Sequence, residues 1–190
     1  MSIWHLAIAL VIVGVLAAAI AHLKRAGDSG DMTKIGGWLV LLVAGLMIFG
    51  PLLGAVRLDS SFVAAEFQYR LLSKLPEWAT YKTAAWSAFW GTSLFTFYAG
   101  WRLAYTRRAT AVTTAIIALW TAGPAMTLVI NILLPALIFG KAELPSSDVS
   151  TLFGSALMAG IWTAYLLRSK RVKVRYVDGL IPAPGVAMGV

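Results

Sequence analysis

The feature that most constrains this chain is a series of five long runs of apolar residues. A helix needs about 20 mostly apolar residues to cross the ~30 Å hydrocarbon core of a bilayer, because each residue adds about 1.5 Å. We therefore predict an all-α integral membrane protein, with residues 1–173 as a single five-helix transmembrane domain and residues 174–190 as a C-terminal cytoplasmic tail. The predicted transmembrane helices cover residues 3–23, 35–56, 83–101, 111–139 and 149–167.

The composition agrees with this class of protein. Hydrophobic residues make up 59% of the chain and charged residues 13%, whereas soluble domains carry about 25% charged residues. So much apolar material excludes a disordered chain. The absence of cysteine excludes a disulfide scaffold and a cysteine-ligated metal site. The first run has no Lys or Arg before it and is longer than the ~7–15 residues of a signal-peptide core, so we expect a retained span.

The distribution of Lys and Arg predicts the orientation. The segments after the first, third and fifth spans lie on one side of a five-span protein, and they hold 11 of the 16 Lys and Arg residues. By the positive-inside rule this side is cytoplasmic, which places the N-terminus outside and the C-terminus inside. The whole net charge of +8 belongs to this side. A membrane topology therefore accounts for the charge, and we expect no nucleic-acid partner.

Groups that could carry catalysis are missing from the predicted spans. No ionisable residue lies deep in a span, which argues against a proton relay or a voltage sensor. No metalloprotease, hydrolase or paired-carboxylate pattern is present. His5 and His22 lie about 25 Å apart along the first helix, so they cannot share a metal within one monomer. We predict a protein that is not an enzyme and has no cofactor.

Asn131 is the one amide inside a predicted span. It lies between Pro124 and Pro135, in a span of 29 residues that must tilt, kink or protrude. One interpretation is a hydrogen bond between helices. The other is a polar contact to a substrate or a lipid headgroup.

Small residues recur every four positions in the predicted second and fifth spans, a spacing that lets helices approach closely in lipid. This spacing serves packing within the chain or against another subunit, and the sequence does not separate the two. The candidate helix-interface residues are Gly50, Gly54, Ala156, Gly160 and Ala164.

A basic cluster follows the fifth span. Each cation near an anionic leaflet contributes about 1 kcal/mol, so the cluster either anchors this span or docks a headgroup or partner. Its members are Arg168, Lys170, Arg171, Lys173 and Arg175.

Two stretches carry a family resemblance. Gly36-Gly37-Trp38-Leu39 opens the second span, and Ile161-Trp162-Thr163-Ala164-Tyr165 runs into Ser169-Lys170-Arg171-Val172-Lys173, with Tyr176 beyond. From Lys34 to Tyr176 the chain resembles the bacterial inner-membrane family called domain of unknown function 2569. The resemblance implies a multi-pass protein of the bacterial inner membrane. Members have four spans, so the first span and the tail after Tyr176 depart from the family, which supplies no site residues.

These observations favour a non-catalytic accessory or structural subunit that binds and stabilises a larger inner-membrane complex, of respiratory or photosynthetic type. Its expected partners are membrane lipids and other membrane-protein subunits. The alternative is a small homo-oligomeric transporter or lipid-handling membrane protein, which requires a cavity that reaches Asn131.

Overall fold

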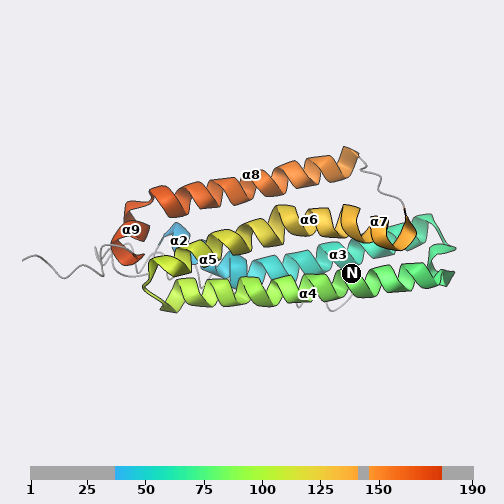
Figure 1. The fold of residues 1–190 in the computed structure, drawn as a ribbon, viewed down its shortest axis with the longest axis horizontal. Coiled ribbons are helices and arrows are strands. Elements are labelled where there is room, and N and C mark those ends of the chain that lie inside the picture. Colours follow the sequence, from blue (N-terminus) through green and yellow to red (C-terminus); the bar gives the residue numbers. More distant parts are fainter. Residues whose placement is uncertain (1–36, 141–145, 177–190) are drawn as a thin grey trace, which may run out of the picture.

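The computed structural model describes residues 37–140 and 146–176, and this part of the chain is all helical (Figure 1). The predicted first span and residues 177–190 of the tail lie outside the described residues. The elements are α2 (Trp38–Ala44), η1 (Gly45–Phe49), α3 (Gly50–Gln68), η2 (Leu72–Lys74), α4 (Pro76–Tyr105), α5 (Ala109–Trp120), η3 (Thr121–Ala125), α6 (Met126–Leu128), η4 (Val129–Leu133), α7 (Leu134–Phe139), α8 (Ser146–Arg168) and α9 (Lys170–Tyr176). Segments η1, η3 and η4 are π-helical, and η2 is a 3₁₀ turn.

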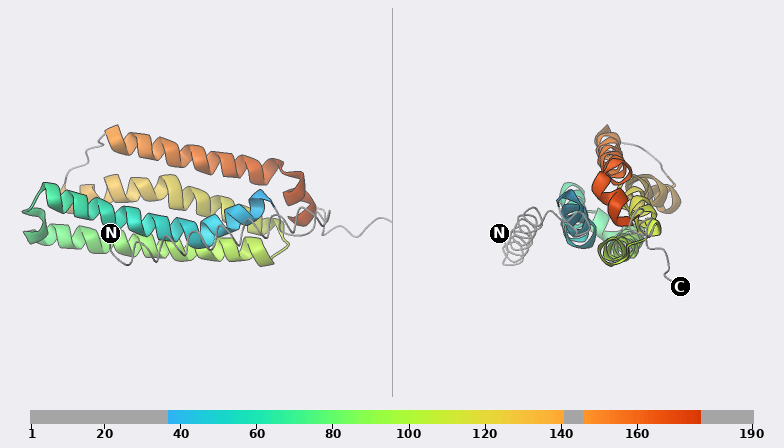
Figure 2. Two further views of the ribbon diagram at one scale, coloured as in Figure 1. Left: turned by 180° about the vertical axis from the view of Figure 1, so that it is seen from behind. Right: turned by 90° about the vertical axis from the view of Figure 1, so that its left-hand side faces the viewer.

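Four long rods run up and down side by side (Figures 1 and 2). The first rod is α2–η1–α3, the second is α4, the third runs from α5 to α7, and the fourth is α8. Short α9 folds back at the end where α8 stops (Figure 1). We call this the α9 end of the bundle, and the opposite end the η2 end.

Three helices in the described part of the chain are long and apolar enough to cross a membrane: Trp38–Gln68, Ala109–Phe139 and Val149–Arg168. Their presence in one chain indicates a multi-pass membrane protein. Helix α4 has 30 residues, or about 45 Å of helix, but it is less apolar than these three. The predicted positions of the last two spans agree with the ends of the observed helices to within three residues.

The first rod continues 12 residues past the predicted end of its span and stops at Gln68. Packing explains the extension, because Leu58 and Phe62 are buried against Trp78 of α4. The connection to α4 is therefore short. Helix α4 begins at Pro76 with Glu77 in its first turn, an arrangement suited to the start of a helix.

Two hydrophobic clusters hold the bundle together. The cluster at the α9 end joins the first three rods, α8 and α9, and Leu39, Leu103 and Leu166 are almost fully buried in it. The cluster at the η2 end joins α3 to α4 and includes Phe62 and Trp78.

Helix α9 closes the end of α4. The Tyr176 hydroxyl donates a hydrogen bond to the carbonyl oxygen of Leu103, and Arg175 Nη2 donates to that of Ala104 at 2.9 Å. Both carbonyls belong to the last turn of α4, where no further helical N–H is available to satisfy them. Burial raises the pKa of the Tyr176 phenol above its ordinary value, although a hydrogen bond with Arg175 opposes the shift.

Candidate functional site: a cavity between the four rods

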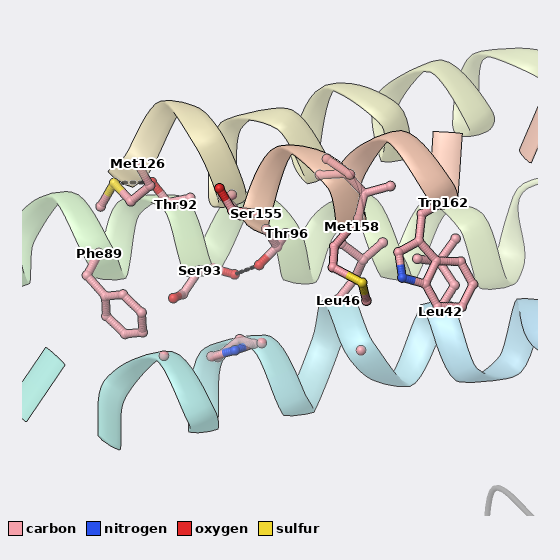
Figure 3. Close-up of a pocket in the computed structure, with 18 of the residues that line it drawn as sticks. Leu42, Leu46, Phe89, Thr92, Ser93, Thr96, Met126, Ser155, Met158 and Trp162 are labelled. Carbon is pink, nitrogen blue, oxygen red and sulfur yellow. Dashed lines mark hydrogen bonds between the residues drawn. The ribbon is translucent and has the colours of Figure 1, made fainter. Parts of the chain in front are cut away.

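A cavity of about 370 Å³ lies between the two clusters and is lined by all four rods. Its wall is mostly apolar, and side chains from α2, α4 and α8 converge on it (Figure 3). Leu42 and Leu46 form the wall on the first rod, with Met158 and Trp162 of α8 opposite them. Such a space suits an apolar group rather than an ion.

A second cavity of about 350 Å³ adjoins the first toward the η2 end. Its lining is more polar, with hydroxyl groups from three rods together with Arg57 and Asn131. Residues on every rod line both spaces, so the two spaces adjoin each other, and we call them the apolar half and the polar half of the cavity. The shared lining residues are Gly54, Phe89, Ala122, Gly123, Met126 and Ser155.

The polarity of this cavity changes along the bundle axis. Arg57, in the polar half, follows Trp38 by 19 residues, which corresponds to about 28 Å of helix. This length is close to the ~30 Å thickness of bilayer hydrocarbon. If Trp38 lies at one membrane interface, Arg57 and Asn131 lie near the other, and the apolar half lies between them.

The three π-helical segments all contribute to the lining. Segment η1 provides Gly45, η3 provides Gly123, and η4 provides Asn131. A π-helical turn widens the helix and frees backbone carbonyls, and such turns occur often at functional sites. In η4, the carbonyl oxygen of Ile130 accepts a hydrogen bond from the Tyr81 hydroxyl at 3.1 Å. The irregular stretches of the first and third rods therefore coincide with the cavity.

Glycine sets how closely the walls approach. A Cβ atom on Gly54 would lie 2.7 Å from Cε2 of Phe89, which is closer than atoms pack, so α3 and α4 meet here only because residue 54 has no side chain. Gly45 differs, because a Cβ atom there would meet nothing within 4 Å. A larger side chain at position 45 would enter the open space.

The side of the cavity between the first rod and α8 is loosely closed. Helix α8 packs mainly on α5, η3 and α6, and makes few contacts with α2 and α3 (Figure 2). At the η2 end, Arg57 Nη2 donates a hydrogen bond to Thr151 Oγ1 at 3.1 Å. At the α9 end, the rings of Trp38 and Trp162 meet edge to face, with their centroids 6.4 Å apart. We call this side the α3–α8 seam.

Several predicted site residues line the cavity. Asn131 lies in its polar half, and the side-chain amide has no hydrogen-bond partner among the described residues. Gly54 lines both halves, and Gly50 lines the apolar half. The structure thus brings Asn131 and the small residues of the first rod to one place.

The small residues of α8 face elsewhere. Its buried residues, Ala159 and Leu166, face the bundle, whereas Ala164 is exposed and Ala156 is half-buried. A Cβ atom on Gly160 would meet nothing within 4 Å. This row is not used for packing between the described helices.

The basic cluster divides into two groups. Arg168, Lys170 and Lys173 are exposed and Arg171 is half-buried. Arg175 is only 7% exposed and binds the end of α4. In the structure Arg175 therefore serves the packing of α9 on α4, whereas the docking of a headgroup or partner stays a prediction for the cluster.

Sequence reasoning missed several polar residues of the cavity lining. Arg57 was assigned to a connection, because the second span was expected to end at residue 56. Thr92, Ser93 and Thr96 of α4 were not singled out, although their spacing places three hydroxyls on one helical face, and all three line the cavity. That pattern was the available signal. No group of His and acidic side chains in the described part of the chain could hold a metal ion.

A multi-pass, all-helical membrane bundle with an internal cavity is thus the class of protein that the fold defines. The chain belongs to the family described as protein of unknown function (DUF2569), whose family model matches residues 32–177. This match confirms the resemblance from Lys34 to Tyr176. No curated protein and no solved structure matches the chain.

Proposed function

We propose that this chain is a non-catalytic membrane protein that accommodates a lipid-like molecule between its helices. One observation carries the proposal: two adjoining spaces share part of their lining, and the one in the middle of the bundle is apolar whereas the one near the η2 end is polar. An amphipathic molecule has the same order of polarity along its length. The loosely closed α3–α8 seam supports a route from the bilayer, because lateral entry spares the apolar chain a passage through water.

The topology that we propose has five spans in the bacterial inner membrane, with the N-terminus outside and the C-terminus in the cytoplasm. Support for α4 as a span comes from its neighbours, since it lies beside the first and third rods throughout their length (Figure 1). The excess of Lys and Arg at the α9 end supports the orientation. The span over residues 3–23 rests on its sequence.

The test uses a phosphatidylcholine that carries a photoreactive diazirine in its acyl chain. The full-length protein is reconstituted in vesicles of this lipid, irradiated and mapped by mass spectrometry. Ser93 and Thr96 are 8% and 5% exposed, so an acyl chain reaches them only through the cavity. Leu94 and Phe97 of the same helix are exposed and report ordinary contact with surrounding lipid.

In the natural protein we expect labelling of the cavity residues Ser93 and Thr96 and of the exposed residues Leu94 and Phe97. Gly45→Leu places a side chain in the apolar half, so labelling of Ser93 and Thr96 should fall while that of Leu94 persists. Gly91→Leu is the matched control, because a Cβ atom at Gly91 also meets nothing within 4 Å and this residue does not line the cavity. Labelling confined to Leu94 and Phe97 in the natural protein would refute the proposal.

A second candidate function, an accessory subunit of a larger membrane complex, is favoured by the outward row of small residues on α8. Gly160 and Ala164 leave space for a helix from another chain. Gly160→Leu should reduce co-purification of other membrane proteins after mild solubilisation, with Gly91→Leu again as the control. Isolation of the natural protein without other subunits would count against this role.

A further inference from the structure

The polar half of the cavity has the chemistry of a binding site for a negatively charged headgroup. Arg57 is the one charged residue in its lining, and no Asp or Glu lines it. Among the described side chains, Lys82 and Glu66 form an ion pair, with Lys82 Nζ 2.8 Å from Glu66 Oε1. Arg57 has no carboxylate partner among these side chains. Arg57 is an exposed residue, and it places beside this space a positive charge that no described carboxylate pairs.

Donors other than Arg57 are also available there. The side-chain amide of Asn131 has no described partner and can donate two hydrogen bonds. The Thr151 hydroxyl accepts one hydrogen bond from Arg57 at 3.1 Å and keeps its own proton to donate. A guanidinium, an amide and a hydroxyl from three rods suit the oxygen atoms of a phosphate.

The apolar half next to the polar half indicates that the phosphate belongs to a lipid. The apolar half begins at Gly54 and Phe89, which line both spaces. A free phosphate ion would leave the apolar half unfilled, whereas a phospholipid would fill it with an acyl chain. The lining offers no carboxylate for the cationic group of a choline or ethanolamine headgroup, so a zwitterionic lipid gains less.

We propose that the cavity binds an anionic phospholipid, with its phosphate on Arg57, Asn131 and Thr151 and one acyl chain extending toward Trp162. This inference rests on the proposed function and adds the chemical class of the ligand. The Arg57–Thr151 hydrogen bond helps to orient this site. A guanidinium has five N–H groups, so Arg57 can bind the phosphate while it keeps its hydrogen bond to Thr151.

The experiment compares two lipids in competition. The full-length protein is reconstituted in nanodiscs with equal amounts of phosphatidylglycerol and phosphatidylcholine, then released into detergent, and its retained lipid is identified by mass spectrometry. One favourable charge near the headgroup predicts enrichment of phosphatidylglycerol by about fivefold or more. Arg57→Gln should bring the ratio close to one, and Arg57→Lys should keep most of the preference.

Arg70→Gln is the matched control, because Arg70 is exposed beyond the end of α3 and does not line the cavity. An unchanged ratio in Arg57→Gln, or no preference in the natural protein, would overturn the inference. Displacement of phosphatidylglycerol by inorganic phosphate would also overturn it, in favour of a site for the free ion.

Photolabelling of Thr96 separates this inference from the proposed function. If Thr96 is labelled and the ratio of phosphatidylglycerol to phosphatidylcholine is close to one, a lipid chain occupies the cavity. In that case only the proposed preference for an anionic headgroup is wrong. If Thr96 is not labelled in the natural protein, both proposals fail. Labelling of Thr96 in Arg57→Gln also shows that this variant has folded.

Discussion

Tyr176 is the residue on which the docking of α9 most depends. Its side chain is fully buried, and its hydroxyl satisfies the Leu103 carbonyl in the last turn of α4. Removing a large buried aromatic side chain costs about 3–5 kcal/mol, so Tyr176→Ala should be strongly destabilising. Tyr176→Phe keeps the ring and removes only the donor. Leaving a buried carbonyl unsatisfied costs about 1–3 kcal/mol.

Thermal unfolding in detergent, followed by tryptophan fluorescence, measures both changes. A stability change of 1 kcal/mol shifts Tm by about 2–4 °C in a chain of this size. Tyr176→Ala should therefore lower Tm by at least about 6 °C, and Tyr176→Phe by about 2 °C or more. Tyr105→Phe is the control, because Tyr105, at the end of α4, is 69% exposed. Equal melting of Tyr176→Phe and Tyr105→Phe would refute the capping role of α9.

Three further predictions follow from the same contacts. Burial raises the pKa of Tyr176. The stability that its neutral phenol contributes is therefore complete below about pH 10 and is lost as pH rises through the folded-state pKa. The Tm difference between the natural protein and Tyr176→Phe should shrink in alkaline buffer, and a constant difference would contradict this. Gly54→Ala should lower Tm, because overpacking against Phe89 costs about 1–3 kcal/mol. Gly91→Ala should raise Tm slightly through helix propensity. Equal changes of Tm in the two variants would show that Phe89 moves aside. Trp38→Ala should increase photolabelling of Thr96, because it removes the ring contact with Trp162 at the seam, and reduced labelling would place the entry route elsewhere.

The proposed ligand would give Arg57 of the first rod a charged partner. Arg57 is exposed, and its partner in the described structure is the Thr151 hydroxyl. A cation near the end of a membrane span can reach water or headgroups, so it need not be paired within the bundle. A bound phosphate would supply a negative charge at this position.

The sequence by itself determined the class of protein and the approximate positions of three long apolar helices. These properties depend on local runs of apolar residues and on the ~30 Å thickness of the bilayer, neither of which requires knowledge of the packing. The family was also visible in local motifs, at Gly36-Gly37-Trp38-Leu39 and around Trp162. The length of the first rod could not be predicted from the sequence, because burial of Phe62 against Trp78 extends α3 past its apolar run.

The candidate site was decided by the tertiary structure. Asn131 was singled out as an isolated amide, but Arg57 and Thr151 come from other rods and line the same space only because three rods converge there. The two groups of small residues had the same spacing, yet Gly54 faces the bundle and Gly160 faces outward. A periodic pattern states which residues share a helical face, and only the rotation of each helix in the bundle decides what that face meets.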